Sequence, residues 1–170
     1  MTDAEFQAVF DEHKDAVYRF AWRMSRSPVA AEDITQDVFV GLLRHPGRFD
    51  PARGTLRAFL FGIARNLALK HWRAEHRLEP LDGEAVVADP VDFGRGEVGD
   101  MVGQAVRALR PLQREVVILA EYEGLTLAEI AQAVDADVGT VKSRLHRARE
   151  NLRRALAPMR SRQPAQGLCP

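Results

Sequence analysis

The sequence predicts an all-α protein made of two small helical domains joined by a flexible acidic linker. Apolar residues recur at the spacing of helical turns through most of the chain, and no run alternates as a strand does. One acidic stretch, punctuated by glycine and proline, interrupts this pattern. The predicted boundaries are 1–78 for the first domain, 79–98 for the linker, 99–158 for the second domain and 159–170 for a disordered tail.

The first domain is predicted to contain three helices that share one core. The first ends near residues 25–28, the second ends before His45, and the third runs from about residue 55 to residue 77. Each helix has apolar residues along one side. These positions include Phe6, Phe10, Val17 and Phe20 in the first helix, Ile34, Val38 and Leu42 in the second, and Leu56, Phe59, Leu60, Ile63 and Leu67 in the third.

The second domain is predicted to contain helices over residues 101–110 and 111–123, followed by a helix-turn-helix. Thr126 and Glu129 form the capping box that opens its short first helix. Asp137 is placed to cap the second, longer helix. The residues expected to face inward are Leu127, Ile130, Ala131 and Val134 in the short helix, and Val141, Leu145, Ala148 and Leu152 in the long one.

Four polar residues of this last helix fall on one side within two turns, at spacing i, i+1, i+4 and i+5. A helix in the major groove presents side chains to base edges in this way. Four arginines around them suit phosphates, which position a domain without reading sequence. A solvated, arginine-rich helix face is the alternative. The four polar residues are Lys142, Ser143, His146 and Arg147, and the four arginines are Arg144, Arg149, Arg153 and Arg154.

The third helix has a polar stripe of its own. Asn66, Lys70, Arg73 and Arg77 follow the spacing i, i+4, i+7 and i+11, which places one amide and three cations on one side. An amide can bond the edge of an extruded base, and cations can hold a single-stranded backbone. The alternative is a solvated basic stripe.

The charge distribution agrees with two such contacts. Residues 51–78 carry a net charge of +5 and residues 138–162 carry +7, while residues 79–100 between them carry −6. Two separated basic blocks predict two contacts with a polyanion, although two solvated helix faces would carry the same charges.

The second helix has an acidic and amide-bearing face. Asp33 and Asp37 are four residues apart, with Gln36 beside them. Such a face can pair with basic residues on a partner helix, and a solvated face is the alternative.

Nothing in the sequence predicts catalysis, a metal site or a cofactor. The five histidines are scattered without a partner pattern, and the one cysteine, Cys169, excludes a disulfide framework. No basic and apolar leader follows Met1, and no apolar run approaches ~18 residues. We therefore expect a cytoplasmic protein that is not an enzyme and does not insert into a membrane.

Two motifs carry a family resemblance. The segment G-L-T-L-A-E-I-A at 124–131, followed by V-G-T-V-K-S-R-L-H-R-A-R at 138–149, resembles region 4 of bacterial RNA polymerase sigma factors of the extracytoplasmic-function (ECF) type. Response-regulator output domains share parts of it. The N-terminal half distinguishes between these two families, because A-E-D-I-T-Q-D-V-F at 31–39 resembles the sigma region 2 segment that docks on the polymerase clamp helices. R-N-L-A at 65–68 matches part of the family's promoter-melting helix.

The resemblance to the sigma-70 family implies a promoter-specific transcription initiation factor. Its partners would be core RNA polymerase, promoter DNA and an anti-sigma factor that restrains it. The first domain would be region 2, with Asp33, Gln36 and Asp37 on the polymerase. The second would be region 4, whose helix-turn-helix reads the minus-thirty-five duplex. Melted minus-ten DNA would be held by the Asn66 helix and by the loop 48–55, where Arg53 is available.

The chain departs from the family pattern at a few positions. Many members have an aromatic residue where Leu56 stands and a tryptophan where Phe59 stands, and Lys70 replaces a residue that is often acidic. Phe59 is predicted to be core, while Phe61 and Trp72 remain open between core and base-stacking roles.

Two other classes of protein remain open. One is a stand-alone helix-turn-helix regulator whose N-terminal helices dimerise or sense a signal. The other is an interaction protein that only sequesters polymerase, for which the basic last helix would have no use.

Overall fold

The computed structural model describes residues 1–83 and 98–160; the rest of the predicted linker and the tail from residue 161 lie outside the described residues. Every regular element in the described ranges is helical, so the predicted all-α fold is confirmed. None of these helices combines the length and the apolar content that crossing a bilayer requires.

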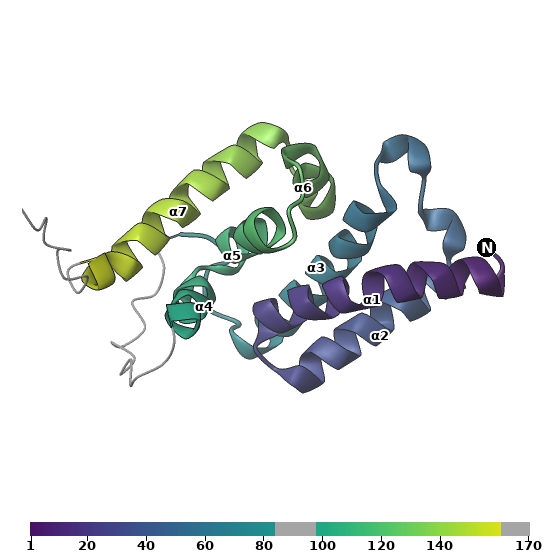
Figure 1. The fold of residues 1–170 in the computed structure, drawn as a ribbon, viewed down its shortest axis with the longest axis horizontal. Coiled ribbons are helices and arrows are strands. Elements are labelled where there is room, and N and C mark those ends of the chain that lie inside the picture. The colour runs from purple at the N-terminus through teal and green to yellow at the C-terminus, as the bar shows by residue number, and fades with distance from the viewer. Residues whose placement is uncertain (84–97, 161–170) are drawn as a thin grey trace, which may run out of the picture.

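Figure 1 shows how the helices are arranged in two halves. In the N-terminal half, α1 spans Asp3–Ser25, α2 spans Pro28–Arg44 and α3 spans Leu56–Glu75, with short 3-10 turns at Pro46–Arg48 and Pro51–Arg53. In the C-terminal half, α4 spans Val98–Ala108, α5 spans Pro111–Val117, α6 spans Leu127–Val134 and α7 spans Val138–Arg160. A π-helical turn at Ile118–Tyr122 continues α5.

Side-chain caps begin the three N-terminal helices. Thr2 and Glu5 form a capping box at α1, Ser27 accepts a bond from the Ala30 N–H at α2, and Thr55 accepts one from the Ala58 N–H at α3. Each cap satisfies a backbone donor that has no partner within its helix. The apolar sides of the three helices contribute to one buried core, which also includes residues of the C-terminal half.

The predicted end of the third helix was wrong by two residues. α3 ends at Glu75, because His76 leaves the helical conformation (φ −129°, ψ 54°) and its ring stacks on Trp72 with 4.7 Å between centroids. Arg77 therefore lies beyond the helix, and the polar stripe of α3 consists of Asn66, Lys70 and Arg73.

The helix-turn-helix has the predicted local structure. Thr126 and Glu129 form the capping box of α6, and Asp135 takes a left-handed conformation (φ 51°) in the turn. The Asp137 carboxylate accepts the Thr140 N–H at 2.7 Å and so caps α7. The inward residues Val141, Leu145 and Ala148 are buried, whereas Leu127, Ala131 and Leu152 are only half-buried.

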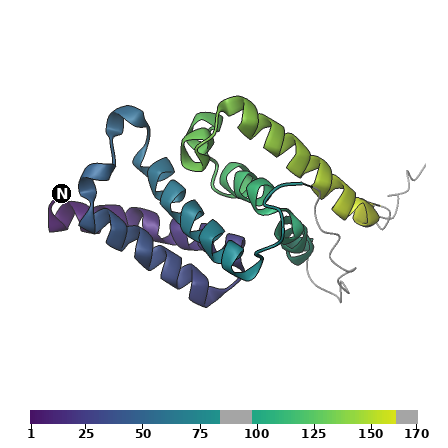
Figure 2. The same cartoon turned by 180° about the vertical axis from the view of Figure 1, so that it is seen from behind.

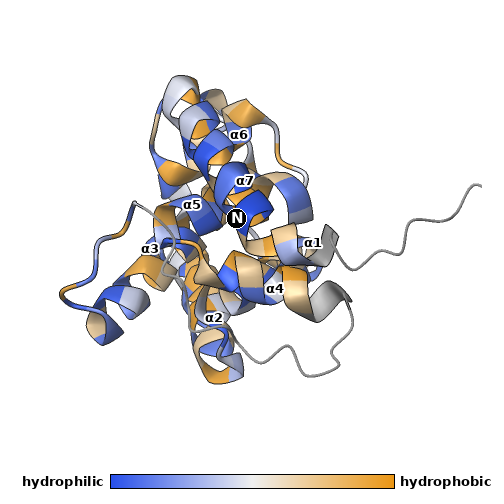
Figure 3. Cartoon of the chain, turned by 90° about the vertical axis from the view of Figure 1, so that its left-hand side faces the viewer, coloured by the Kyte–Doolittle hydropathy of each residue, from blue (hydrophilic) through white to orange (hydrophobic). Residues whose placement is uncertain are grey.

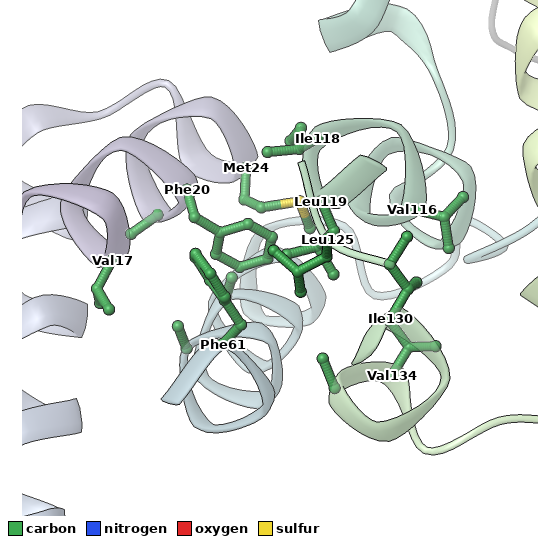
Figure 4. Packing of buried hydrophobic residues seen from close by; sticks show 14 of the residues in the cluster. Val17, Phe20, Met24, Phe61, Val116, Ile118, Leu119, Leu125, Ile130 and Val134 are labelled. Atoms are coloured by element: carbon green, nitrogen blue, oxygen red, sulfur yellow. The ribbon is translucent and has the colours of Figure 1, made fainter. Parts of the chain in front are cut away.

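The two halves pack directly against each other. Figures 1 and 2 show α5 and α6 beside α1 and α3, with α7 on the far side of the C-terminal half. Figure 4 shows Phe20, Met24 and Phe61 of the N-terminal half next to Leu119 and Leu125 of the C-terminal half. The side view in Figure 3 shows that hydrophobic and hydrophilic residues alternate along the helices, as amphipathic packing requires. The sequence did not predict this contact between the halves.

Small residues allow the helices of the two halves to approach closely. A Cβ atom added at Gly62 of α3 would lie 3.2 Å from the carbonyl oxygen of Ala133 in α6. The crossing of α3 and α6 therefore depends on glycine at position 62.

We predict that Leu119→Ala destabilises both halves together. Leu119 is fully buried in the shared core, so the truncation should cost about 2–5 kcal/mol of unfolding free energy. Both tryptophans, Trp22 and Trp72, lie in the N-terminal half. In urea titrations, their fluorescence and the far-ultraviolet dichroism should shift to a lower midpoint in parallel. A fluorescence transition unmoved by the substitution would contradict a shared core.

Candidate nucleic-acid interface

The basic face of α7, formed by Lys142, Ser143, His146 and Arg147, is exposed. The opposite side of the helix is buried, so the core of the C-terminal half orients these four side chains toward solvent. Arg147 Nη1 lies 3.6 Å from the Asp82 carboxylate. The face has the geometry that insertion into a groove requires, and contact with DNA stays a prediction.

Two of the flanking arginines of α7 have internal partners. Arg149 Nη2 lies 2.7 Å from Glu121 Oε1, and both side chains are about half exposed. The Arg144 side chain is only 18% exposed, and its Nη1 is 4.0 Å from the buried Glu115. In this arrangement Arg149 remains accessible to a phosphate, whereas Arg144 points into the protein.

The start of the predicted linker is held against the C-terminal half. The Leu112 N–H donates to Leu81 O at 3.1 Å, and Gln113 Nε2 donates to Gly83 O at 2.7 Å. Gln113 is 1% exposed and accepts a bond from Asn151 of α7 at 2.7 Å. Sequence patterns missed this buried polar pair, because neither residue interrupts an apolar repeat.

The polar stripe of α3 is exposed at Asn66, Lys70 and Arg73. Arg53 is also exposed, in the loop that precedes α3, and Arg77 is exposed after the helix has ended. The structure therefore places four of these five predicted contacts along one helix and its preceding loop.

The three aromatic residues considered for base stacking have different surroundings. Phe61 is 1% exposed and packs edge-to-face on Phe20 at 5.5 Å, so it belongs to the core. Phe59 is half-buried against Phe49, also at 5.5 Å. Trp72 is half-buried beneath His76.

A buried carboxylate of the C-terminal half reaches the polar stripe of α3. Glu115 in α5 is fully buried and accepts two bonds from Arg65, from Nε at 2.8 Å and from Nη2 at 3.1 Å. Arg65 Nη1 also lies 3.3 Å from Asn66 Oδ1. Burial raises the pKa of the Glu115 carboxyl, although Arg65 and Arg144 act to lower it. In the amino-acid sequence, Glu115 stands out only as a lone acid before the apolar run V-V-I-L.

A second contact joins the loop before α3 to α6. Gln132 Oε1 accepts the Thr55 N–H at 3.1 Å, and Gln132 Nε2 donates to Thr55 O at 3.2 Å. Thr55 Oγ1 also donates to Glu129 at 3.3 Å. A side chain at Gly54, where φ is +151°, would collide with the Gln132 carboxamide. Sequence patterns missed Gln132 as a contact residue.

A third contact involves the end of the π-helical turn. Glu123 is 7% exposed and lies 3.4 Å from Arg19 and 3.9 Å from Arg23, one turn apart on α1. Arg57 of α3 donates to the Glu123 carbonyl. Charged contacts thus surround the apolar interface between the halves.

The acidic face of α2, formed by Asp33, Gln36 and Asp37, is exposed. Ile34 and Val38 on the other side of α2 are buried against α1 and α3. Figure 1 shows α2 on the side of the N-terminal half that faces away from α6 and α7. This face is free to meet a partner while the two halves are packed together.

Within the described residues, no group of three or more His, Cys, Asp or Glu side chains is placed to hold a metal ion.

We predict that Glu115→Gln changes how stability depends on pH. A carboxyl with a raised folded-state pKa binds its proton more tightly when folded, so its contribution to the unfolding free energy decreases as pH rises from about 4.5. The variant lacks this titration. Urea titrations at several pH values give the unfolding free energy of wild type minus that of the variant. This difference should therefore decrease toward neutral pH. A difference that increases with pH would show that attraction by Arg65 outweighs burial.

Two family models match the chain. Sigma-70 region 2 matches residues 9–78, and Sigma-70, region 4 matches residues 99–152.

Two similar proteins belong to the same family as these models. The ECF RNA polymerase sigma factor SigK of Mycobacterium sp. (strain KMS) is 34% identical over 152 residues, covering 82% of this chain and 77% of the relative. The ECF RNA polymerase sigma factor BldN of Streptomyces coelicolor is 33% identical over 158 residues, covering 89% of this chain and 60% of the relative.

Two solved structures are similar over both halves of the chain. The sigma factor RpoE in complex with the anti-sigma factor NepR from Bartonella quintana has a TM-score of 0.70 and 28% identity, covering 90% of this chain and 97% of that one. CnrH in complex with the cytosolic domain of CnrY has a TM-score of 0.70 and 25% identity, covering 92% of this chain and 90% of that one.

Proposed function

Since the chain belongs to the ECF group of the sigma-70 family of RNA polymerase sigma factors, we propose that it directs core RNA polymerase to promoters by contacting DNA at two points. Its relatives are transcription initiation factors rather than enzymes. The proposed domains are region 2 at 1–78, an acidic linker at 79–98, region 4 at 99–158 and a tail at 159–170.

The observation that carries this proposal is the exposed basic face of α7 on a well-formed helix-turn-helix. Inserted into the major groove, this face would read the minus-thirty-five duplex through base edges. Arg149 would contact phosphate, and Arg144 would do so only after turning away from Glu115.

In region 2, the polar stripe of α3 and the loop before it would hold the melted minus-ten strand. Asn66 offers an amide to a base edge, while Arg53, Lys70 and Arg73 offer cations to the backbone. Arg77, beyond the end of α3, would contact the strand from the following turn.

The acidic face of α2 would dock on core polymerase. Carboxylates on an exposed helix face are suited to a basic partner surface, where they steer association and fix register. An anti-sigma factor is proposed as a further partner, because the similar sigma factor RpoE was solved bound to one. A stand-alone DNA-binding regulator would instead bind its operator tightly without polymerase.

The proposal is tested by run-off transcription with core polymerase on fragments of the source genome. Wild type should start transcripts, while Asn66→Ala and Arg147→Ala should each reduce them about tenfold, since one base contact is worth about 1–3 kcal/mol. Gln7→Ala in α1 and Arg107→Ala in α4 are the matched controls, as both residues are exposed outside the proposed contacts. Absence of transcripts from any promoter, or tight operator binding without polymerase, would refute the sigma-factor role.

Asp37→Lys should weaken binding to core polymerase about tenfold, because it places a cation where a basic partner surface is expected. Fluorescence anisotropy of labelled protein titrated with core enzyme measures this. Glu12→Lys, an equal charge change on exposed α1, should leave the affinity unchanged. Equal losses from both substitutions would show that overall charge, rather than the acidic face of α2, governs binding.

A further inference from the structure

We propose that the side of α7 against which residues 81–83 lie is a binding site for a phosphate of the DNA backbone, with Gln113 as its central donor. This inference rests on the proposed function, because it takes the basic face of α7 as the face that enters the major groove. Residues 81–83 occupy the site in the free chain. Three observations carry the proposal: the donors of the site, the acceptors that fill it, and its position beside the basic face of α7.

The site is built around the side-chain amide of Gln113 in α5. Gln113 is 1% exposed, and its Oε1 accepts a bond from Asn151 Nδ2 at 2.7 Å. This bond fixes the orientation of the amide, so its Nε2 group is directed at residues 81–83. Arg154 of α7 donates to Asn151 Oδ1 in turn. The site therefore presents an amide donor and a cation that are both held by the buried side chain of Asn151.

The groups that fill the site are hydrogen-bond acceptors. Gln113 Nε2 donates to Gly83 O at 2.7 Å and to Asp82 Oδ1 at 3.2 Å. Asp82 Oδ2 lies 3.6 Å from Arg147 Nη1. Two oxygens of one phosphate can take the places of these acceptors, since amide donors and guanidinium groups bind both carboxylates and phosphates. Asp82 therefore occupies the position that we assign to the phosphate.

The site adjoins the basic face of α7. At about 100° per residue, Arg147 and Arg154 point within roughly 20° of each other around the helix axis. Arg147 belongs to both the basic face and the site. A cavity of about 370 Å³, lined by Gln113, Arg147 and Arg154 among others, lies at this flank. When a helix lies in the major groove, side chains along its flank meet the phosphates of the groove wall.

An acidic peptide is the other ligand that such donors could hold. Continuity with the basic face of α7 favours DNA, because a duplex whose bases meet Arg147 brings its own phosphates to the same flank. The acid that lines the cavity, Glu150, is paired with Arg153. The cations of the flank therefore remain available to a phosphate.

The linker start and the phosphate exclude each other at this site. Both require Gln113 Nε2 and the Arg147 guanidinium. Release of residues 81–83 leaves the buried Gln113 amide without its acceptors, which is unfavourable until another acceptor arrives. Phosphate binding and release of the linker start should therefore favour each other.

Duplex binding by the full free chain tests the site. The probe is a fluorescein-labelled duplex of about 20 base pairs and arbitrary sequence, because a phosphate contact carries no sequence information. Gln113→Glu keeps the acceptor for Asn151, repels residues 81–83, and places a negative charge where the phosphate binds. Anisotropy at low salt should show about tenfold weaker binding. If residues 81–83 merely covered α7, their release would strengthen binding instead, so the sign of the change is decisive.

Asp82→Asn removes the competing charge and should tighten duplex binding about threefold. Glu79→Gln is the matched control, because it removes the same charge three residues away, where the carboxylate pairs with Arg110. This control should leave the affinity unchanged. Arg154→Gln should weaken binding and reduce the slope of log Kd against log salt concentration by about one.

Two results would overturn the proposal: duplex binding by Gln113→Glu that is as tight as wild type or tighter, which would leave a site for acidic peptides only, or no duplex binding by any variant, Asp82→Asn included. If circular dichroism shows that Gln113→Glu has lost helix, the exposed Arg154→Gln replaces it, and an unchanged salt dependence then overturns the proposal. Run-off transcription tests the proposed function separately, because wild type can start transcripts whether or not this site binds phosphate.

Discussion

The apolar contact between the two halves is the constraint on which the position of every candidate residue depends. Phe20 and Phe61 on one side and Leu119 and Leu125 on the other are each at most 6% exposed. Burial of each such side chain contributes about 1.5–3 kcal/mol, more than an exposed ion pair does. The apolar faces therefore determine which helix sides meet. The faces of α2 and α7 remain outside because their charges would be costly to bury.

A buried cation reinforces this contact from its edge. Arg114 of α5 is 8% exposed and donates to three carbonyl oxygens, those of Met24 at 2.7 Å, Arg107 at 2.6 Å and Leu109 at 2.9 Å. Burial lowers the pKa of its guanidinium to about 10, so it stays charged at neutral pH. Carbonyls at helix C-termini lack partners within the helix and carry partial negative charge. One side chain thereby joins the end of α1 to the end of α4.

The sequence predicted what depends on neighbours along the chain and missed what depends on neighbours across it. The Thr126–Glu129 capping box and the inward side of α7 follow from residue types at fixed spacing, and both were predicted. The end of α3 was misplaced, because the stacking of His76 on Trp72 has no periodic signature. Glu115 and Arg65 lie 50 residues apart, and each looks like an ordinary surface charge until the fold brings them together.

The hydrogen bond that holds Leu81 on α5 determines how far apart the two halves of the chain can move. While Leu81 O accepts the Leu112 N–H, only the residues between Glu75 and Leu81 connect α3 to the other half. Fully extended, these residues span about 20 Å. Once that hydrogen bond and the Gln113 contacts are released, the connection lengthens to residues 75–98, whose maximum span is about 80 Å. The hydrogen bond between Leu81 and Leu112 therefore limits how far the halves can separate. They can separate by a short distance while it is intact, and by a long distance only after it has broken.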